Sequence, residues 1–166
     1  MSDLLRNLDP KLDLKLDRVI DVPVALVWKA WTTPEHLMKW FTPEPWKTVE
    51  CEIDLRPGGV FRTVIESPDG DRMDTPACYL EVVENEKLTF TDAMQRDFRP
   101  SSVPNACFDH YFTAHLFLQP DGKGTRYTVV ALHASEADRK AHEEQGFHDG
   151  WGTALDQLVA MAKSMV

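Results

Sequence analysis

Alternation of apolar and polar residues in seven segments constrains the fold more than any other feature of this chain. In the first segment Leu12, Leu14 and Leu16 share one parity, as the buried face of a half-exposed strand requires. Turn sequences such as Arg56-Pro57-Gly58-Gly59 separate neighbouring segments. Short turns join antiparallel strands, so the pattern predicts an α+β protein with a curved antiparallel sheet of seven strands. The expected strands are 12–20, 48–55, 60–66, 77–83, 88–94, 110–118 and 125–133.

Helical spacing follows the first strand and returns at the end of the chain. Two short helices are expected from the apolar residues after Pro23 and after Pro34. Ser135, with Asp138 three residues later, predicts a helix start, and Gly146 predicts an interruption. A long C-terminal helix is then predicted from a stripe of apolar residues at steps of three and four: Trp151, Leu155, Leu158, Ala162 and Met165.

A single long helix is too narrow to cover the concave face of a seven-stranded sheet. Each apolar face must nevertheless be buried, so the gap is filled by large side chains or by a bound molecule. We therefore expect a cavity between the sheet and the C-terminal helix. Residues 95–109 have no clear period, and a connection of that length is either a lid or binding loop, or partly disordered.

Composition limits the class of protein and its partners. The 166 residues fit one domain spanning 1–166, with its core at about 12–163. A formal net charge of −9 disfavours nucleic acid and anionic membranes, and no segment predicts a membrane span or a signal peptide. Cys51, Cys78 and Cys107 form no CxxC pair, so we expect free thiols and a cytoplasmic location. A homodimer through an edge strand or the aromatic helices is an open alternative to a monomer.

Three spaced motifs resemble those of a known family. They are Val22-Pro23 with Val27-Trp28 and Pro34-Glu35, then Arg56-Pro57-Gly58-Gly59 with Phe61, then Gly150-Trp151 with Leu155 and Leu158. The chain resembles the Hsp90-ATPase-activator-homologue-like branch of the START-like (Bet v 1-like, SRPBCC) superfamily over roughly residues 12–163. The resemblance implies a helix-grip fold, in which the sheet wraps the C-terminal helix around an apolar tunnel. That fold hosts lipid carriers, hormone sensors, polyketide cyclases and co-chaperone modules.

Candidate ligand-binding residues combine aromatic side chains with a few polar groups, as apolar pockets do. Several of the aromatic residues can equally be plain core. Asp92 shares the parity of Leu88 and Phe90, so it either points inward, paired with Arg18 or Arg62, or lies at a strand end in water. The candidates are Trp40, Trp46, Phe61, Tyr79, Phe90, Asp92, His110, Phe112, Trp151, Leu155 and Arg18.

The chain shows no spacing that predicts a metal or a cofactor. His115 and His133 lie on strands without a ligand spacing, and His142 and His148 are not an i, i+4 pair. There is no GxSxG, P-loop or GxGxxG motif, and adjacent Asp109 and His110 would point to opposite faces of a strand. We therefore expect no metal, no cofactor and no assignable catalytic residue.

The leading functional hypothesis is a protein that binds a small hydrophobic or amphipathic molecule in the internal cavity. The first alternative is a cyclase- or hydrolase-type enzyme that uses the same cavity with Asp92, Arg18 and His110. The second is a regulatory module resembling an Hsp90 co-chaperone, although the additional N-terminal domain of a eukaryotic activator is not present in these residues.

Overall fold

The computed structural model describes residues 3–104 and 108–165. Its main feature is a seven-stranded sheet in the order β1-β9-β8-β5-β4-β3-β2, in which every neighbouring pair is antiparallel. The predicted sheet is therefore confirmed. Its strands are β1 (Asp13–Ile20), β2 (Lys47–Ile53), β3 (Val60–Glu66), β4 (Arg72–Val83), β5 (Lys87–Thr91), β8 (Phe112–Asp121) and β9 (Gly124–His133).

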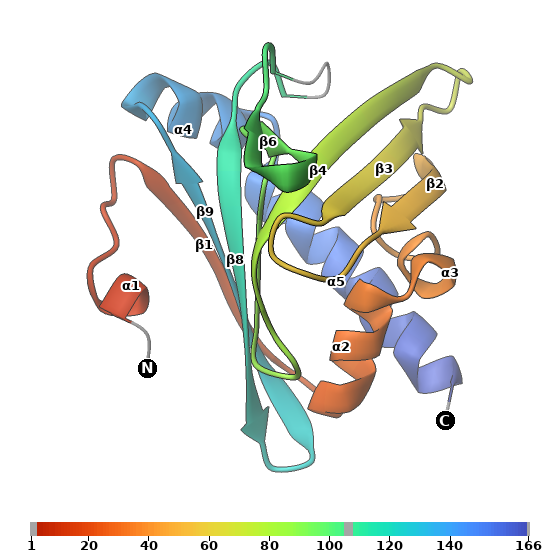
Figure 1. The fold of residues 1–166 in the computed structure, drawn as a ribbon. Coiled ribbons are helices and arrows are strands. Elements are labelled where there is room, and N and C mark those ends of the chain that lie inside the picture. The colour runs from red at the N-terminus through yellow and green to blue at the C-terminus, as the bar shows by residue number, and fades with distance from the viewer. Residues whose placement is uncertain (1–2, 105–107, 166) are drawn as a thin grey trace.

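Helices α2, α3 and α5 lie on one face of this curved sheet (Figure 1), with α5 running diagonally across it and α2 and α3 beside it. The arrangement confirms both the two short helices and the long C-terminal helix. Among the helices of residues 3–104 and 108–165, none has the length and the apolar run needed to cross a membrane. The helices are α1 (Asp3–Arg6), α2 (Val24–Thr32), α3 (Pro34–Leu37), α4 (Glu136–Glu144) and α5 (Phe147–Ser164).

The boundary between α4 and α5 follows the local sequence. The Ser135 hydroxyl accepts a hydrogen bond of 3.1 Å from the Asp138 N–H and caps α4. Gly146 then adopts φ +93°, a conformation that favours glycine, and α5 starts at the next residue. The apolar stripe is shorter than expected, because α5 ends at Ser164 and Met165 is 38% exposed.

The motif Arg56-Pro57-Gly58-Gly59 forms a turn that only small residues allow. Gly58 has φ +81°, and a Cβ on Gly59 would come within 1.9 Å of the Asp54 carbonyl oxygen. Backbone hydrogen bonds join Gly58 and Gly59 to Tyr79 of β4, so the turn extends the sheet at this corner.

Part of the segment expected to be a loop, 95–109, is a small hairpin. It consists of β6 (Met94–Gln95), the 3-10 turn η1 (Arg96–Phe98) and β7 (Arg99–Pro100). The hairpin packs on the glycine turn, with Asp97 N–H donating to Gly58 O at 2.8 Å. Residues 105–107, which include Cys107, lie outside the described residues, while Cys51 and Cys78 are free thiols.

Arg18 of β1 contacts α5. Its side chain points inward from β1, as parity predicts, and its Nη1 lies 2.8 Å from Asp156 Oδ1 of α5. A Cβ on Gly152 would come within 2.5 Å of Arg18 Nη2, so the guanidinium lies directly on the helix. This ion pair replaces the predicted role of Arg18 as a partner of Asp92.

Gly150 and Gly152 provide a matched test of this contact. A Cβ on Gly150 meets no atom of the described residues within 4 Å, so Gly150→Ala should raise the free energy of unfolding by about 0.5–1 kcal/mol through helix propensity. Gly152→Ala must move the flexible end of Arg18 that pairs with Asp156, so it should be less stable than Gly150→Ala by about 0.5 kcal/mol. Urea unfolding of both variants measures the difference. Equal gains in stability would mean that Arg18 does not hold the helix.

Candidate ligand-binding cavity

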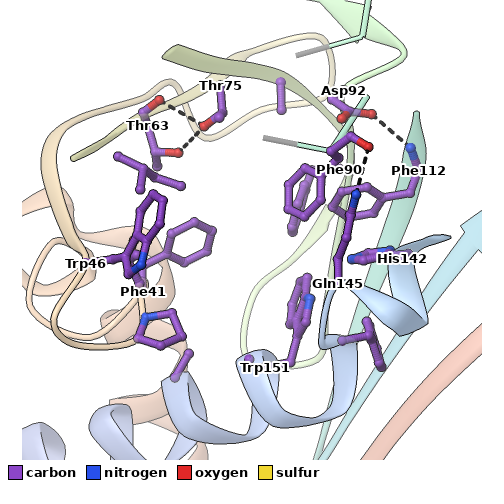
Figure 2. A pocket seen from close by; sticks show the side chains of 18 of the residues that line it. Phe41, Trp46, Thr63, Thr75, Phe90, Asp92, Phe112, His142, Gln145 and Trp151 are labelled. Carbon is purple, nitrogen blue, oxygen red and sulfur yellow. Dashed lines mark hydrogen bonds between the residues drawn. The ribbon is translucent and has the colours of Figure 1, made fainter. Parts of the chain in front are cut away.

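A cavity of about 510 Å³ lies between α5, the α2–α3 segment and the inner face of the sheet. Its strand wall comes mainly from β3, β4 and β5, and Phe112 of β8 and Tyr127 of β9 complete it. Figure 2 shows Trp151 of α5 on one side and Phe41 and Trp46 opposite it, with the space between them. Trp46 is 39% exposed, so the cavity reaches solvent beside this residue.

Most of the predicted ligand-binding residues line this cavity, although their binding role stays a prediction. The lining includes Trp40, Trp46, Phe61, Phe90, Asp92, Phe112 and Trp151. The remaining candidates are not among the described lining residues: Arg18, Tyr79, His110 and Leu155.

Each of these four side chains has another place in the fold. Arg18 binds Asp156, and Tyr79 stacks on Phe61 at 5.3 Å between ring centroids. Leu155 is 1% exposed in the apolar core below α5, and His110 lies in a separate cluster described below.

Aromatic rings form a continuous frame around the cavity. Trp31 connects its parts, with ring centroids 5.0 Å from Trp40, 6.0 Å from Phe90 and 6.4 Å from Trp151. Phe90 also meets Phe61 edge to face at 4.9 Å. Trp31 Nε1 donates to the Tyr127 hydroxyl at 3.1 Å, so the ring at the centre of the frame is fixed in orientation.

Asp92 is the acidic group of the lining. It directly follows β5, is 9% exposed, and accepts a hydrogen bond of 2.9 Å from the backbone N–H of Phe112 (Figure 2). Burial raises the pKa of this carboxyl to about 6, against the opposing effect of that hydrogen bond. The inward alternative for Asp92 is thus the one observed.

The partners proposed for Asp92 were wrong. Arg18 pairs with Asp156, and Arg62 pairs with Asp74 at 2.9 Å. Arg62 faces away because it lies on β3 next to Phe61, which points into the cavity, and adjacent strand residues point to opposite faces.

Other polar lining groups escaped the sequence analysis. Thr63 and Thr75, on paired positions of β3 and β4, have hydroxyls hydrogen-bonded to each other, and Thr75 also donates to Thr63 O at 2.9 Å. Gln145 donates to Phe108 O at 3.4 Å across the cavity from Trp46 (Figure 2). Strand parity could have identified the two threonines, because they share the inward face of β3 and β4 with other lining residues. Gln145 follows α4 in the bend before Gly146, where no strand or helix period applies.

Gln157 of α5 shapes the cavity without lining it. Its amide N–H groups donate to the carbonyls of Trp40 and Thr42, both at 2.9 Å, and its Oε1 accepts from Glu44 N–H at 3.0 Å. The segment that carries Phe41 and Trp46 is therefore tied to the helix opposite the sheet. The apolar periodicity of the helix does not identify Gln157, because its role depends on hydrogen bonds to a distant segment.

Three histidines that are far apart in sequence lie together at one end of the cavity. His110, His133 and His142 are buried, and one ring nitrogen of each lies within 4.8 Å of the others. His142 also lines the cavity. Neutral imidazoles grouped in this way can hold a metal ion, which the linear spacing of the histidines did not predict.

The fold and the cavity can now be compared with known proteins. The sequence profile named Activator of Hsp90 ATPase homolog 1-like protein matches residues 21–163. A search of curated proteins finds no significant match.

Solved structures provide closer comparisons. Protein NE0264 from Nitrosomonas europaea is 46% identical, with 95% of this chain and 98% of that chain covered and a TM-score of 0.89. Protein Ms6760 from Mycobacterium smegmatis is 26% identical, with 91% and 90% covered and a TM-score of 0.71. A protein from Arthrobacter aurescens, at 22% identity, 95% and 90% coverage and a TM-score of 0.79, shares the fold. The chain therefore belongs to the Activator of Hsp90 ATPase homolog 1-like protein family.

Proposed function

We propose that this protein binds a small hydrophobic or amphipathic molecule in the cavity between α5 and the sheet. The observation that carries the proposal is a cavity of about 510 Å³ whose walls are mostly aromatic and aliphatic. Pockets for small ligands typically measure roughly 300–1,000 Å³ and place a few polar groups in an apolar lining. This cavity has both properties.

The lining favours a ligand with an apolar body and one polar end. Trp31, Phe61, Phe90 and Trp151 offer ring faces and edges to a flat or branched apolar group. Asp92 offers a carboxyl that accepts a hydrogen bond when ionised and donates one when protonated. A hydroxyl, carbonyl or amine on the ligand can form a hydrogen bond with this group.

A second candidate function is proton transfer on the bound molecule. A carboxyl whose pKa is about 6 inside an apolar cavity has the acidity that general acid or base catalysis near neutral pH requires. Of the residues first considered for this chemistry, Asp92 lines the cavity, while Arg18 and His110 do not. The enzyme alternative therefore depends on Asp92.

We also propose that residues 1–166 act as one ligand-binding unit in the cytoplasm. The free thiols of Cys51 and Cys78 support this location, because a reducing compartment keeps thiols free.

Filling the cavity should remove ligand binding without unfolding the protein. Gly150 and Ala154 line the cavity from one face of α5, and a side chain on Gly150 starts in open space. We expect Gly150→Phe and Ala154→Phe to weaken binding of the neutral fluorescent probe N-phenyl-1-naphthylamine at least about tenfold, the equivalent of about 1.4 kcal/mol. A fluorescence titration measures the dissociation constants.

Thr153→Phe is the matched control, since Thr153 lies on the exposed side of the same helix. This variant should bind the probe as the wild type does. Equal binding by all variants would show that the probe sits outside the cavity, and the proposal would then lack support.

Asp92 should make stability depend on pH in a defined direction. Its pKa is higher in the folded protein than the ordinary 3.8, so the folded state holds the proton more tightly than the unfolded state does. The contribution of Asp92 to stability therefore falls as pH rises from about 4 to about 6, by at most about 3 kcal/mol, and is constant above that range. Asp92→Asn keeps an oxygen for the Phe112 N–H and should lose this part of the slope. Urea unfolding of the wild type and of Asp92→Asn at a series of pH values measures this difference. If the free energies of unfolding of the two proteins change with pH in parallel, the pKa of Asp92 is not raised in the folded state.

A further inference from the structure

The histidine cluster combines residues from three separate parts of the chain. His110 precedes β8, His133 is the last residue of β9, and His142 lies in α4. Their exposed fractions are 4%, 7% and 2%, and one ring nitrogen of each lies within 4.8 Å of the others. Imidazoles that are this close and this buried need partners for their nitrogen atoms.

Two of the histidines have a fixed arrangement. His133 Nδ1 lies 2.8 Å from the Leu12 carbonyl oxygen, which can only accept, so Nδ1 carries the proton and Nε2 keeps its lone pair. His142 Nδ1 lies 2.8 Å from that His133 Nε2. A backbone carbonyl that fixes the tautomer of a histidine is the usual outer partner of a metal ligand.

The third histidine is unsatisfied. His110 Nε2 is buried and has no hydrogen-bond partner among the residues that the structure describes. The ring packs against His142 at 5.2 Å and against His133 at 5.7 Å between centroids. The hydrogen-bonded pair of His133 and His142 therefore explains two members of the cluster and leaves His110 unexplained.

The surroundings favour neutral imidazoles. Burial, together with the neighbouring histidines, lowers the pKa of His142 to about 3, and burial also lowers the pKa of His133. Phe108, Phe112 and Phe147 enclose His142, with ring centroids 5.1, 4.7 and 5.3 Å from it. Neutral imidazole is the form that ligates metals, and an apolar shell around polar ligands is typical of metal sites.

We propose that His110, His133 and His142 bind a divalent transition-metal ion of the Zn²⁺ class at the end of the cavity. Bonds of about 2.0–2.1 Å in tetrahedral geometry place ligand nitrogens about 3.4 Å apart, so the observed spacings need only sub-ångström to ångström movements of the rings. Three protein ligands leave one coordination position, as in catalytic zinc sites. Since His142 also lines the cavity, the ion would lie beside the bound molecule. The site does not depend on the identity of that molecule.

Metal titration of the wild-type protein tests the site directly. The protein is prepared without a histidine tag, treated with EDTA and dialysed, then titrated with Zn²⁺ by calorimetry and with Co²⁺ by visible spectroscopy. We expect about one equivalent of Zn²⁺ to bind and Co²⁺ to give the absorption bands of a four-coordinate nitrogen site. Nitrogen-15 NMR of the imidazoles should show Zn²⁺-dependent shifts on His110, His133 and His142.

His110→Phe and His148→Gln form the matched pair of variants. Phenylalanine removes the unsatisfied nitrogen and retains an aromatic ring, so His110→Phe should stay folded and weaken Zn²⁺ binding at least about 100-fold, above the 10–100-fold typical of losing an outer partner. His148 is exposed on α5, and His148→Gln should bind Zn²⁺ as the wild type does.

Three results would overturn the metal site. They are wild-type protein that binds no Zn²⁺, imidazole shifts confined to histidines outside the cluster, or a folded His110→Phe variant with undiminished affinity. If His110→Phe does not fold, the wild-type NMR titration alone decides the question. Each result stands apart from binding of the fluorescent probe, so the ligand proposal and the metal proposal fail separately.

Discussion

Burial of the apolar stripe of α5 against the curved sheet sets the geometry on which the rest of the structure depends, with Leu155, Leu158 and Ala162 at most 1% exposed. On the β1 side, Gly152 lets the Arg18 guanidinium lie directly on the helix and pair with the exposed Asp156. A helix fixed at one edge of a curved sheet leaves a gap above the other strands. The gap lies mainly over β3, β4 and β5, and Phe112 of β8 and Tyr127 of β9 complete the strand wall of the cavity.

Aromatic packing keeps this gap open. Trp31, with no exposed surface, is fixed by its hydrogen bond to Tyr127 and contacts rings from α2–α3, the sheet and α5. On the far side, Gln157 ties the segment carrying Phe41 and Trp46 to α5. Large rings held from several directions cannot collapse into the space between them without losing their own contacts, so the cavity is a consequence of the frame.

Strand parity predicted most of the cavity wall but could not assign partners. It placed Asp92, Phe61 and Phe90 inward, because alternation is a local property of each strand. It also grouped Tyr79 with the lining, whereas the Tyr79 ring stacks on Phe61, a long-range contact that the parity of β4 does not record. The histidine cluster was missed because it forms only when the end of β9, the start of β8 and α4 meet. The spacing of the three histidines along the chain therefore does not predict that they lie together.

Mass spectrometry of organic extracts tests most directly whether the cavity holds a small apolar molecule. Wild-type protein and the Gly150→Phe variant would be purified from the same host and extracted in equal amounts. We expect an apolar compound at about one molecule per wild-type chain, and its loss from the variant whose cavity is filled. The same compounds at the same trace level in both extracts would contradict it.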